Sequence, residues 1–242
     1  MPIAPGGLPD FSRAALLLDL DGTLIDIAPT PDSVVVPPAL PLTLTRLRDL
    51  LGGALAVISG RVIGQIDHLL PGIPTAVSGE HGGAIRHHKG GQIERPDLPS
   101  VPDAWRDAGQ ALIARYPGAL FEPKTRGFVL HFRGAPEAGP ILRAALEEML
   151  APASDRFQLM EARMAWEIRP RGADKGSAVR AVMREAPFAG RLPVMIGDDV
   201  TDHEAIDAAS ALGGGGMLVP DVFGDAPGVR AWLAEVAEKG GW

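Results

Sequence analysis

Two acidic residues follow an apolar run near the start of the chain, in DLDGTL at residues 19–24. Asp19 ends this run, where an unpaired buried carboxylate would be costly. Asp21 lies two residues further on, and Gly22 permits a sharp turn. Two carboxylates at a strand end can hold a hard cation and still leave one oxygen free to attack phosphorus. The same residue types also favour strand ends and helix caps, so this motif alone leaves both interpretations open.

A second acidic cluster stands in GDDVTD, residues 197–202, after another apolar run. We expect its carboxylates, Asp198, Asp199 and Asp202, at the same sheet edge as the first pair. Carboxylates gathered at one edge would repel one another strongly without a compensating cation. Mg²⁺ meets this need, because it prefers oxygen ligands and retains waters. The alternative is that some of these residues only cap the following helix.

Groups that could bind a phosphate occur at two other places. Ser59 stands in ISGR, residues 58–61, after an apolar run and before a helical pattern. The free N–H groups at such a helix start bind anions. Lys175 stands at the head of another predicted helix, where its charge would stabilise a phosphoryl group in transfer. Each feature alone is common in turns or on surfaces, so the evidence lies in their combination and order.

Apolar runs that alternate with helical patterns predict a parallel sheet with both faces buried. The runs lie at residues 14–20, 54–59, 75–83 and 192–199. In such sheets ligands bind beyond the carboxyl ends of the strands, which is where the polar residues above fall. Strand-like and helical segments between these runs predict an inserted α+β unit. We therefore expect a core of residues 1–84 and 170–242, and a substrate-specificity cap at 85–169.

Composition excludes several classes of protein. The formal net charge of −7, without a dense basic run, disfavours a nucleic-acid-binding surface. The chain has no cysteine, which excludes disulfides and thiolate metal sites and suits a reducing cytosol. No apolar run approaches the roughly 20 residues of a membrane span, and no secretory signal pattern is present. Neither GxxxxGK[ST] nor HExxH occurs. We expect a monomer in the cytoplasm, with no membrane or nucleic-acid partner.

DLDGTL, a serine after an apolar run, a lysine and GDDVTD occur in an order that resembles the haloacid dehalogenase-like (HAD) phosphatases. The resemblance implies a Rossmann-like parallel-sheet core with an inserted α+β cap of the C2 type. It implies that Asp19 forms an aspartyl-phosphate, and that Asp21 protonates the leaving alcohol and later activates water. Ser59 and Lys175 would bind the phosphoryl oxygens. The implied Mg²⁺ ligands are Asp19, the backbone carbonyl of Asp21 and Asp198, with Asp199 or Asp202 in support.

Longer segments resemble the trehalose-6-phosphate phosphatases within that superfamily. They are DLDGTLIDIAPTPDSVVVPP (19–38), ISGR (58–61), SGEHGG (78–83), FEPKTRGFVLHFR (121–133) and AWEIRPRGADKG (165–176). In that subgroup an ExK pair, the Arg of an HxR triplet and a Glu near RP contact the sugar hydroxyls. The matching residues are Glu122, Lys124, Arg133 and Glu167. Arg61 and His81 are expected to face the same cleft. The resemblance therefore implies a Mg²⁺-dependent phosphatase for a small-molecule sugar phosphate, trehalose 6-phosphate.

The chain departs from the subgroup at two positions, and three alternative functions stay open. His203 stands where Glu usually follows GDDxTD, and Phe132 replaces the Tyr of an HYR triplet. A phosphatase for sucrose phosphate or mannosylglycerate phosphate would share every core residue and differ in the cap. A phosphomutase would return the phosphoryl group to its product. A non-enzymatic sugar-phosphate sensor would be expected to lose Asp19 or Asp21, and both are present.

Overall fold

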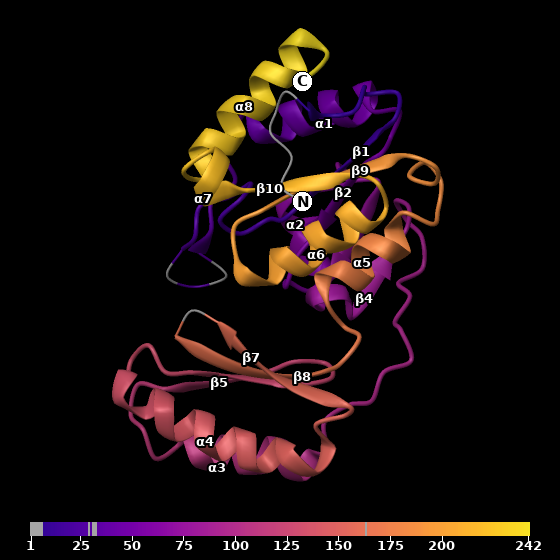
Figure 1. Ribbon diagram of the computed structural model, residues 1–242. Helices are drawn as coiled ribbons and strands as arrows, with labels where there is room; N and C mark the ends of the chain where they lie inside the picture. The colour runs from indigo at the N-terminus through magenta and orange to yellow at the C-terminus, as the bar shows by residue number, and fades with distance from the viewer. Residues whose placement is uncertain (1–6, 29, 31–32, 163) are drawn as a thin grey trace. The chain divides into compact units, whose positions relative to one another are not determined.

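The computed structural model describes residues 7–28, 30, 33–162 and 164–242 (Figure 1). Residues 29, 31 and 32 of the segment 19–38 therefore lie outside the described residues. The chain divides into two compact units: a core unit, Met1–Pro96 with Asp174–Trp242, and an inserted unit, Asp97–Ala173. Each unit has its own cluster of buried apolar side chains.

A six-stranded sheet forms the centre of the core unit, in the order β10-β9-β1-β2-β3-β4. Its strands are β1 (Ala14–Leu18), β2 (Leu55–Ile58), β3 (Ala76–Gly79), β4 (Ala84–Arg86), β9 (Leu192–Gly197) and β10 (Gly215–Leu218). All neighbouring strands are parallel except β3 and β4, which are antiparallel. Every residue of β1, β2 and β3 is buried, as expected for parallel strands covered on both faces.

Helices cover both faces of this sheet (Figure 1). They are α1 (Leu40–Leu50), α2 (Ile63–Leu69), α5 (Lys175–Val182), α6 (Val200–Ala211), α7 (Val219–Val222) and α8 (Ala226–Lys239), with a 3₁₀ turn η3 (Glu80–Gly82). Helix α1 packs against α8 on one side of the sheet, and α5 packs against α6 on the other (Figure 1). No helix within the described residues combines the length and apolar character that a membrane crossing requires.

The inserted unit is a four-stranded antiparallel sheet backed by two helices. Its strands, in the order β5-β6-β8-β7, are β5 (Leu120–Pro123), β6 (Phe128–His131), β8 (Ala165–Pro170) and β7 (Phe157–Ala162). Its helices are α3 (Asp103–Ile113) and α4 (Gly139–Leu150), with 3₁₀ turns η4 (Pro136–Ala138) and η5 (Ala151–Ala153). Phe128 and Leu130 of β6 are buried with Leu142 and Leu146 of α4. Because side chains alternate along a strand, residues such as Val129 occupy the opposite, helix-free face.

The predicted fold class, a mostly parallel α/β core with an inserted α+β unit, is confirmed. The units divide after Pro96 and Ala173, whereas the sequence placed the divisions after residues 84 and 169. Residues 84–86 stay with the core because β4 forms an antiparallel ladder with β3. Pro170 stays with the inserted unit because it pairs with Phe157 at the end of β8. The role of the inserted unit as a specificity cap stays a prediction.

Candidate active site

The carboxyl ends of three neighbouring strands bring distant polar residues together. Asp19 follows β1, Ser59 follows β2 and Asp198 follows β9, and β1 lies between the other two strands. The Asp19 backbone N–H donates to the carbonyl of Ile196 in β9, at 2.9 Å. From β1 the sheet continues through β2 and β3 on one side and through β9 and β10 on the other. The carboxyl end of β1 is therefore a topological switch point. Ligands bind at such points in open α/β sheets.

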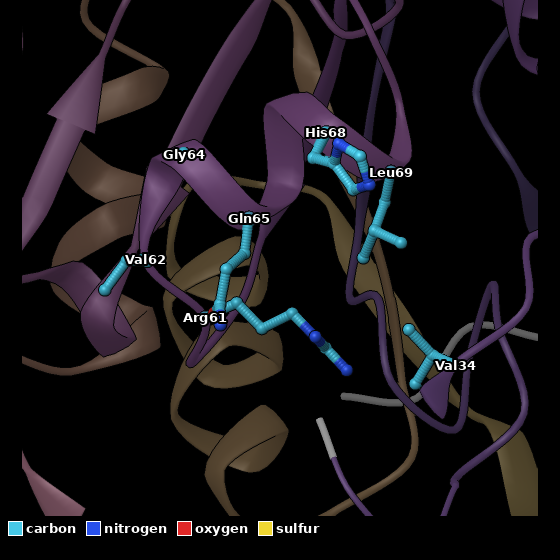
Figure 2. Close-up of a pocket in the computed structure, with 7 residues that line it drawn as sticks. All are labelled: Val34, Arg61, Val62, Gly64, Gln65, His68 and Leu69. Atoms are coloured by element: carbon cyan, nitrogen blue, oxygen red, sulfur yellow. The ribbon is translucent and has the colours of Figure 1, made fainter. Parts of the chain in front are cut away.

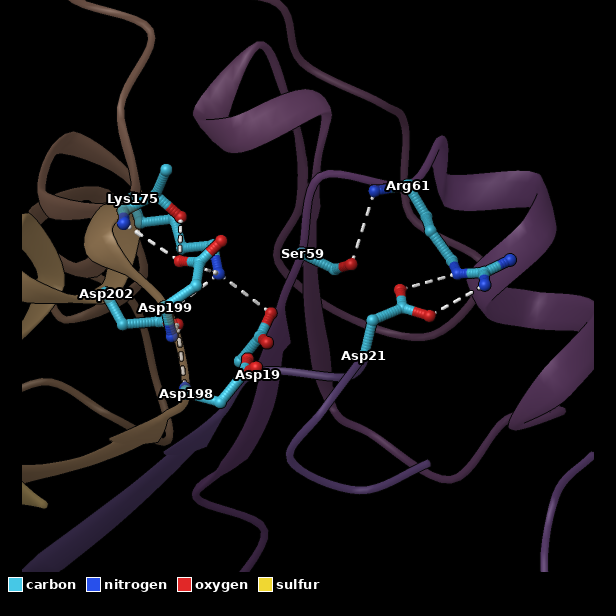
Figure 3. Close-up of polar contacts among 9 residues, drawn as sticks. Asp19, Asp21, Ser59, Arg61, Lys175, Asp198, Asp199 and Asp202 are labelled. Carbon is cyan, nitrogen blue, oxygen red and sulfur yellow. Dashed lines mark hydrogen bonds and ion pairs between the residues drawn. The ribbon is translucent and has the colours of Figure 1, made fainter. Parts of the chain in front are cut away.

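Lys175 joins the acidic residues in a buried ion-pair network (Figure 3). Its Nζ lies 2.8 Å from Asp19 Oδ1 and 2.8 Å from Asp202 Oδ1. The exposed fractions are 2% for Lys175, 4% for Asp19 and 0% for Asp202. Burial opposes the charge of Lys175, but the two carboxylates reverse this effect and raise its pKa. The lysine predicted at a helix head is therefore a buried cation beside the predicted nucleophile.

Two helix caps place these side chains. Asp174 is the N-cap of α5 and forms a capping box with Ser177, so that Lys175 is the first residue of the helix. Asp199 is the N-cap of α6 and forms a capping box with Asp202. The second oxygen of Asp202 also accepts the backbone N–H groups of residues 198 and 199, at 3.0 and 3.1 Å. The caps fix both the lysine and the GDD turn.

Two glycines of the motifs are required by close approach. Gly22 has a φ of +79°, and a Cβ atom there would lie 2.1 Å from Asp198 Oδ2. A Cβ atom at Gly197 would lie 2.1 Å from Asp202 Cγ. Any side chain at either position would displace a carboxylate of the cluster. Gly22 therefore lets the two acidic turns approach each other, and Gly197 lets Asp202 fold back against its own turn.

Three carboxylates lie close enough to share a cation. Oxygens of Asp19, Asp198 and Asp202 all lie within 4.8 Å of one another. Burial raises the pKa of Asp19 to about 7, although Lys175 acts in the opposite direction. Burial together with the charge of Asp199 raises the pKa of Asp198 to about 6. Burial and Asp19 raise the pKa of Asp202 to about 8. One lysine does not offset the burial and mutual repulsion of these three carboxylates, so the residues fit a divalent cation.

The side chains of Asp199, a predicted supporting ligand, and of Asp21, predicted to bind the metal through its backbone carbonyl, contact different partners. Asp199 accepts hydrogen bonds from the backbone N–H and hydroxyl of Thr201, at 2.8 and 2.6 Å. Burial raises its pKa, but Lys175 and Thr201 together lower it overall. The Asp21 side chain is held by Arg61, at 2.7 Å on each oxygen. The grouped acidic side chains among the described residues are those at 19, 198 and 202.

The segment around residues 78–83 anchors the predicted phosphate-binding turn. Glu80 and His81 have positive φ values of 54° and 51°. The His81 N–H donates to the Ser59 carbonyl at 3.1 Å, and the Glu80 N–H donates to the Arg61 carbonyl at 2.9 Å. A Cβ atom at Gly60 would lie 2.4 Å from His81 Nε2, so the imidazole packs directly on the turn. Ser59 is buried, and its Oγ accepts the Arg61 backbone N–H at 3.2 Å.

A pocket of about 440 Å³ lies along α2 beside this turn (Figure 2). It is lined by Val34, Arg61, Val62, Gly64, Gln65, His68 and Leu69. Apart from Arg61, these residues carry none of the predicted chemistry. Arg61 therefore links the pocket wall to the acidic turn through its contact with Asp21.

In the inserted unit, the predicted sugar-binding residues gather on the helix-free face of the sheet. Val129 of β6 is paired with Glu122 on one side and Glu167 on the other, which puts the two carboxylates on one face. Lys124 Nζ lies 2.5 Å from Glu122 Oε1. Burial raises the pKa of Glu167. Arg133 follows β6 and is exposed.

His131 is a member of this cluster that sequence reasoning missed. Its Nε2 lies 2.7 Å from Glu122 Oε2. This hydrogen bond, with the hydrogen bond and charge of Lys124, lowers the pKa of Glu122 to about 2. The alternation of side chains along β6 could have predicted this, because residue 131 shares a face with Val129. His131 is also the first residue of the HFR triplet.

Residues 17–223 match the family model described as trehalose-phosphatase. A probable trehalose-phosphate phosphatase of Sinorhizobium fredii (strain NBRC 101917 / NGR234) is 38% identical over 205 residues, 85% of this chain and 77% of that protein. The trehalose-6-phosphate phosphatase of Escherichia coli (strain K12) is 39% identical over 211 residues, with the same coverage. The chain belongs to the trehalose-phosphatase family.

Solved structures give the trehalose-phosphatase fold independently. The C-terminal domain of Candida albicans trehalose-6-phosphate phosphatase matches with a TM-score of 0.77 and 17% identity, over 94% of this chain and 92% of that one. The sucrose-phosphatase of Synechocystis sp. PCC6803 matches with a TM-score of 0.57 and 18% identity, over 95% and 91%. At such identities these matches show the fold alone. The predicted family and phosphatase class are confirmed by the sequence relatives.

Proposed function

We propose that this trehalose-phosphatase family member hydrolyses trehalose 6-phosphate to trehalose and inorganic phosphate, with Asp19 as the covalent nucleophile. The observation that carries the proposal is the buried Asp19–Lys175 contact of 2.8 Å at the switch point of the sheet. Lys175 donates to Oδ1 of Asp19, and the other oxygen of Asp19 is proposed to attack phosphorus. The ammonium group also offsets the charge that would repel a phosphate dianion.

The reaction proceeds in two displacements. An Asp19 oxygen forms a bond to phosphorus while the ester P–O bond breaks, and Asp21 gives its proton to the leaving sugar oxygen. Water then forms a bond to phosphorus while the bond to Asp19 breaks, and Asp21 takes a proton from that water. Inorganic phosphate leaves and both carboxyl groups return to their starting states. Acid–base assistance of this kind contributes about 10²- to 10⁴-fold. Ser59, at the neighbouring strand end, is proposed to bind a phosphoryl oxygen.

Magnesium is the proposed divalent cation. Asp19 and Asp198 would contribute ligands, and the bound ion would supply charge neutralisation at the phosphoryl group. Both oxygens of Asp202 already accept hydrogen bonds from Lys175 and two backbone N–H groups. We therefore propose that Asp202 holds the lysine and the GDD turn in place. Asp199 supports the same turn as the helix N-cap.

The helix-free face of the inserted unit is proposed to recognise the sugar. A disaccharide offers many hydroxyl groups, and charged side chains make strong hydrogen bonds with them. Glu122, Lys124 and Glu167 share one face through the strand register. Arg133 joins them as a proposed ligand from the end of β6. Buried groups left unpaired by a wrong sugar would provide discrimination.

Phosphate release from trehalose 6-phosphate, with and without Mg²⁺, tests the proposal. Sucrose 6-phosphate, mannosylglycerate phosphate and glucose 6-phosphate serve as comparison substrates. We expect the highest kcat/KM for trehalose 6-phosphate and dependence on the added cation. Equal turnover of all four esters would contradict the assigned specificity, and activity in Asp19→Asn would contradict the covalent scheme. A monomeric state and a cytoplasmic location stay predictions from the sequence.

A further inference from the structure

Asp21 is held by Arg61 in a two-point contact (Figure 3). Arg61 Nε donates to Asp21 Oδ2 at 2.7 Å, and Arg61 Nη2 donates to Asp21 Oδ1 at 2.7 Å. The planar guanidinium matches both carboxylate oxygens, so the contact fixes the plane of the carboxylate as well as its position. A lysine at this position would provide only a point charge.

Arg61 is itself fixed through its backbone. Its N–H donates to Ser59 Oγ, and its carbonyl accepts the N–H of Glu80. The residue lies in the turn between β2 and α2, against which His81 packs. The guanidinium is therefore carried by a turn tied to two neighbouring strand ends. A group held this way can set the direction of another side chain.

The two-point contact leaves Asp21 able to exchange a proton. A carboxylate offers about four acceptor sites, and the guanidinium occupies one on each oxygen. The remaining sites are available for the proton that passes to the leaving group or comes from water. Proton transfer depends on this orientation, because the donor must lie within hydrogen-bond reach of the reacting oxygen.

We propose that Arg61 is a positioning residue for Asp21 in proton transfer, and that its effect on catalysis passes through this carboxylate. The inference rests on the proposed function, in which Asp21 gives a proton as the ester P–O bond breaks and regains one from water. It differs from the sequence expectation that Arg61 faces the sugar. If Arg61 acted on the substrate directly, removing it would weaken turnover whether or not Asp21 were present.

A second ion pair in the core unit provides a matched control. Arg86 of β4 contacts both oxygens of Asp67 in α2, each at 2.6 Å. Side-chain exposures are 13% and 38% for this pair, against 10% and 35% for Arg61 and Asp21. Arg86→Ala therefore removes an equivalent two-point contact without touching the proposed proton donor.

The experiment measures kcat/KM for aryl phosphates whose leaving groups range from phenol to 4-nitrophenol. These esters lack the sugar, and kcat/KM reports the steps through transfer to Asp19. Nitrophenolate leaves without a proton, whereas phenolate needs one. In Arg61→Ala we expect kcat/KM to fall at least about tenfold for phenyl phosphate and less than about threefold for 4-nitrophenyl phosphate. Arg61→Lys should restore part of the loss, and Arg86→Ala should leave the slope against leaving-group pKa unchanged.

Asp21→Asn provides the second arm. This variant should show the same steeper slope, and adding Arg61→Ala to it should cause no further loss, as expected for residues that act as a unit. An additional loss in the double variant would overturn the inference, because Arg61 would then act on the substrate. A normal slope in Arg61→Ala together with a steep slope in Asp21→Asn would overturn the inference about Arg61 and leave the proposed role of Asp21 in place. A normal slope in Asp21→Asn would overturn the proposed role of Asp21 and, with it, this inference. Circular dichroism checks that each variant is folded.

Discussion

Both units contain carboxylates paired with basic side chains, but they differ in their access to water. In the core unit Asp19 and Lys175 are 4% and 2% exposed. In the inserted unit the side chains of Glu122 and Lys124 are 38% and 27% exposed. Coulomb interactions are far stronger where water is excluded, and so is the cost of removing a charge from water. The comparison shows that similar residue types are paired in two environments: Asp19 and Lys175 are excluded from water, whereas Glu122 and Lys124 remain partly solvated.

The pKa values of Asp19 and Glu122 also shift in opposite directions. Burial raises the pKa of Asp19 to about 7 despite its lysine. The hydrogen bond from His131, with the hydrogen bond and charge of Lys124, lowers the pKa of Glu122 to about 2 despite partial burial. At Asp19 desolvation outweighs pairing, whereas at Glu122 pairing outweighs desolvation. Glu167, on the same face as Glu122, follows Asp19, because burial raises its pKa. Substitutions and changes of pH should affect the two sites differently.

Loss of the nucleophile should have the largest effect. Asp19→Asn removes the attacking oxygen, and we expect kcat to fall by about 10⁴-fold or more while the fold is retained. Steady-state phosphate release measures the loss, and circular dichroism checks the fold. Asp67→Asn, in the second ion pair of the core unit, is the control and should keep activity. Full activity in Asp19→Asn would contradict the buried site as the reaction centre.

Lys175→Met should cause the largest change in stability. It leaves the carboxylates of Asp19 and Asp202 buried without their cation, which typically costs about 3–5 kcal/mol. Urea unfolding of the metal-free protein measures the difference. Lys239→Met, which breaks an exposed pair with Glu235 on α8, should change stability by less than about 1 kcal/mol. Equal effects of the two substitutions would remove the contrast between buried and exposed pairs.

Truncation on the helix-free face should affect substrate choice rather than chemistry. Glu122→Ala or Glu167→Ala should raise KM for trehalose 6-phosphate by about 10- to 100-fold, because hydrogen bonds to the sugar are lost. The kinetics of 4-nitrophenyl phosphate, which carries no sugar, should change little. Glu147→Ala, in an exposed pair with Arg143 on α4, is the control. An equal rise in KM for both esters would count against a sugar site in the inserted unit.

The metal-free protein should lose stability as pH rises. The pKa values of Asp19 and Asp202, about 7 and about 8, lie above their ordinary value. Their contribution to stability is therefore present below about pH 4 and is lost as pH rises through 7 and 8. Mg²⁺ should offset this loss, by about 2.7 kcal/mol at 100 times its Kd. Thermal melts from pH 5 to pH 8 should show a magnesium-induced rise in Tm that grows with pH. A rise that shrinks with pH would contradict a carboxylate metal site.

Glu122 should give the smallest effect, with the opposite sign. Its folded pKa of about 2 lies below the ordinary 4.5, so its stabilisation is present above pH 4.5 and is lost as pH falls towards 2. Because the side chain is more than a third exposed, we expect less than about 1 kcal/mol. Acid unfolding of Glu122→Gln against the unchanged protein measures it. A larger acid sensitivity in the variant would contradict the assignment.

The sequence predicted the sheet edge well, because buried parallel strands read as continuous apolar runs. The run 54–59 became β2 and the run 192–199 became β9 with its GDD turn. The segment 165–170 coincides with β8. Strand β4 escaped notice, since a three-residue strand is too short to show a period. The first unit boundary consequently lies after Pro96 rather than after residue 84.

The sequence indicated which types of side chain gather at the site better than it indicated which of them pair. Lys175 and Asp19 lie 156 residues apart in the chain, and Arg61 and Asp21 lie 40 apart. Residue types at strand ends indicated an acidic, cation-binding edge. They did not indicate that Arg61 would meet Asp21, because a long side chain can reach several neighbours from one turn. The contact between His131 and Glu122 depended in the same way on the register of β5 with β6.

The capping box of Asp174 has a consequence for protein engineering. The inserted unit ends at Ala173, and the next residue already closes the first turn of α5 with Ser177. The unit also has a hydrophobic core of its own. A chimera that exchanges residues 97–173 for the corresponding part of a relative would leave the helix cap at Asp174, Lys175 and the acidic turns untouched. Such an exchange would test the proposal that the inserted unit selects the ester while the core unit cleaves it.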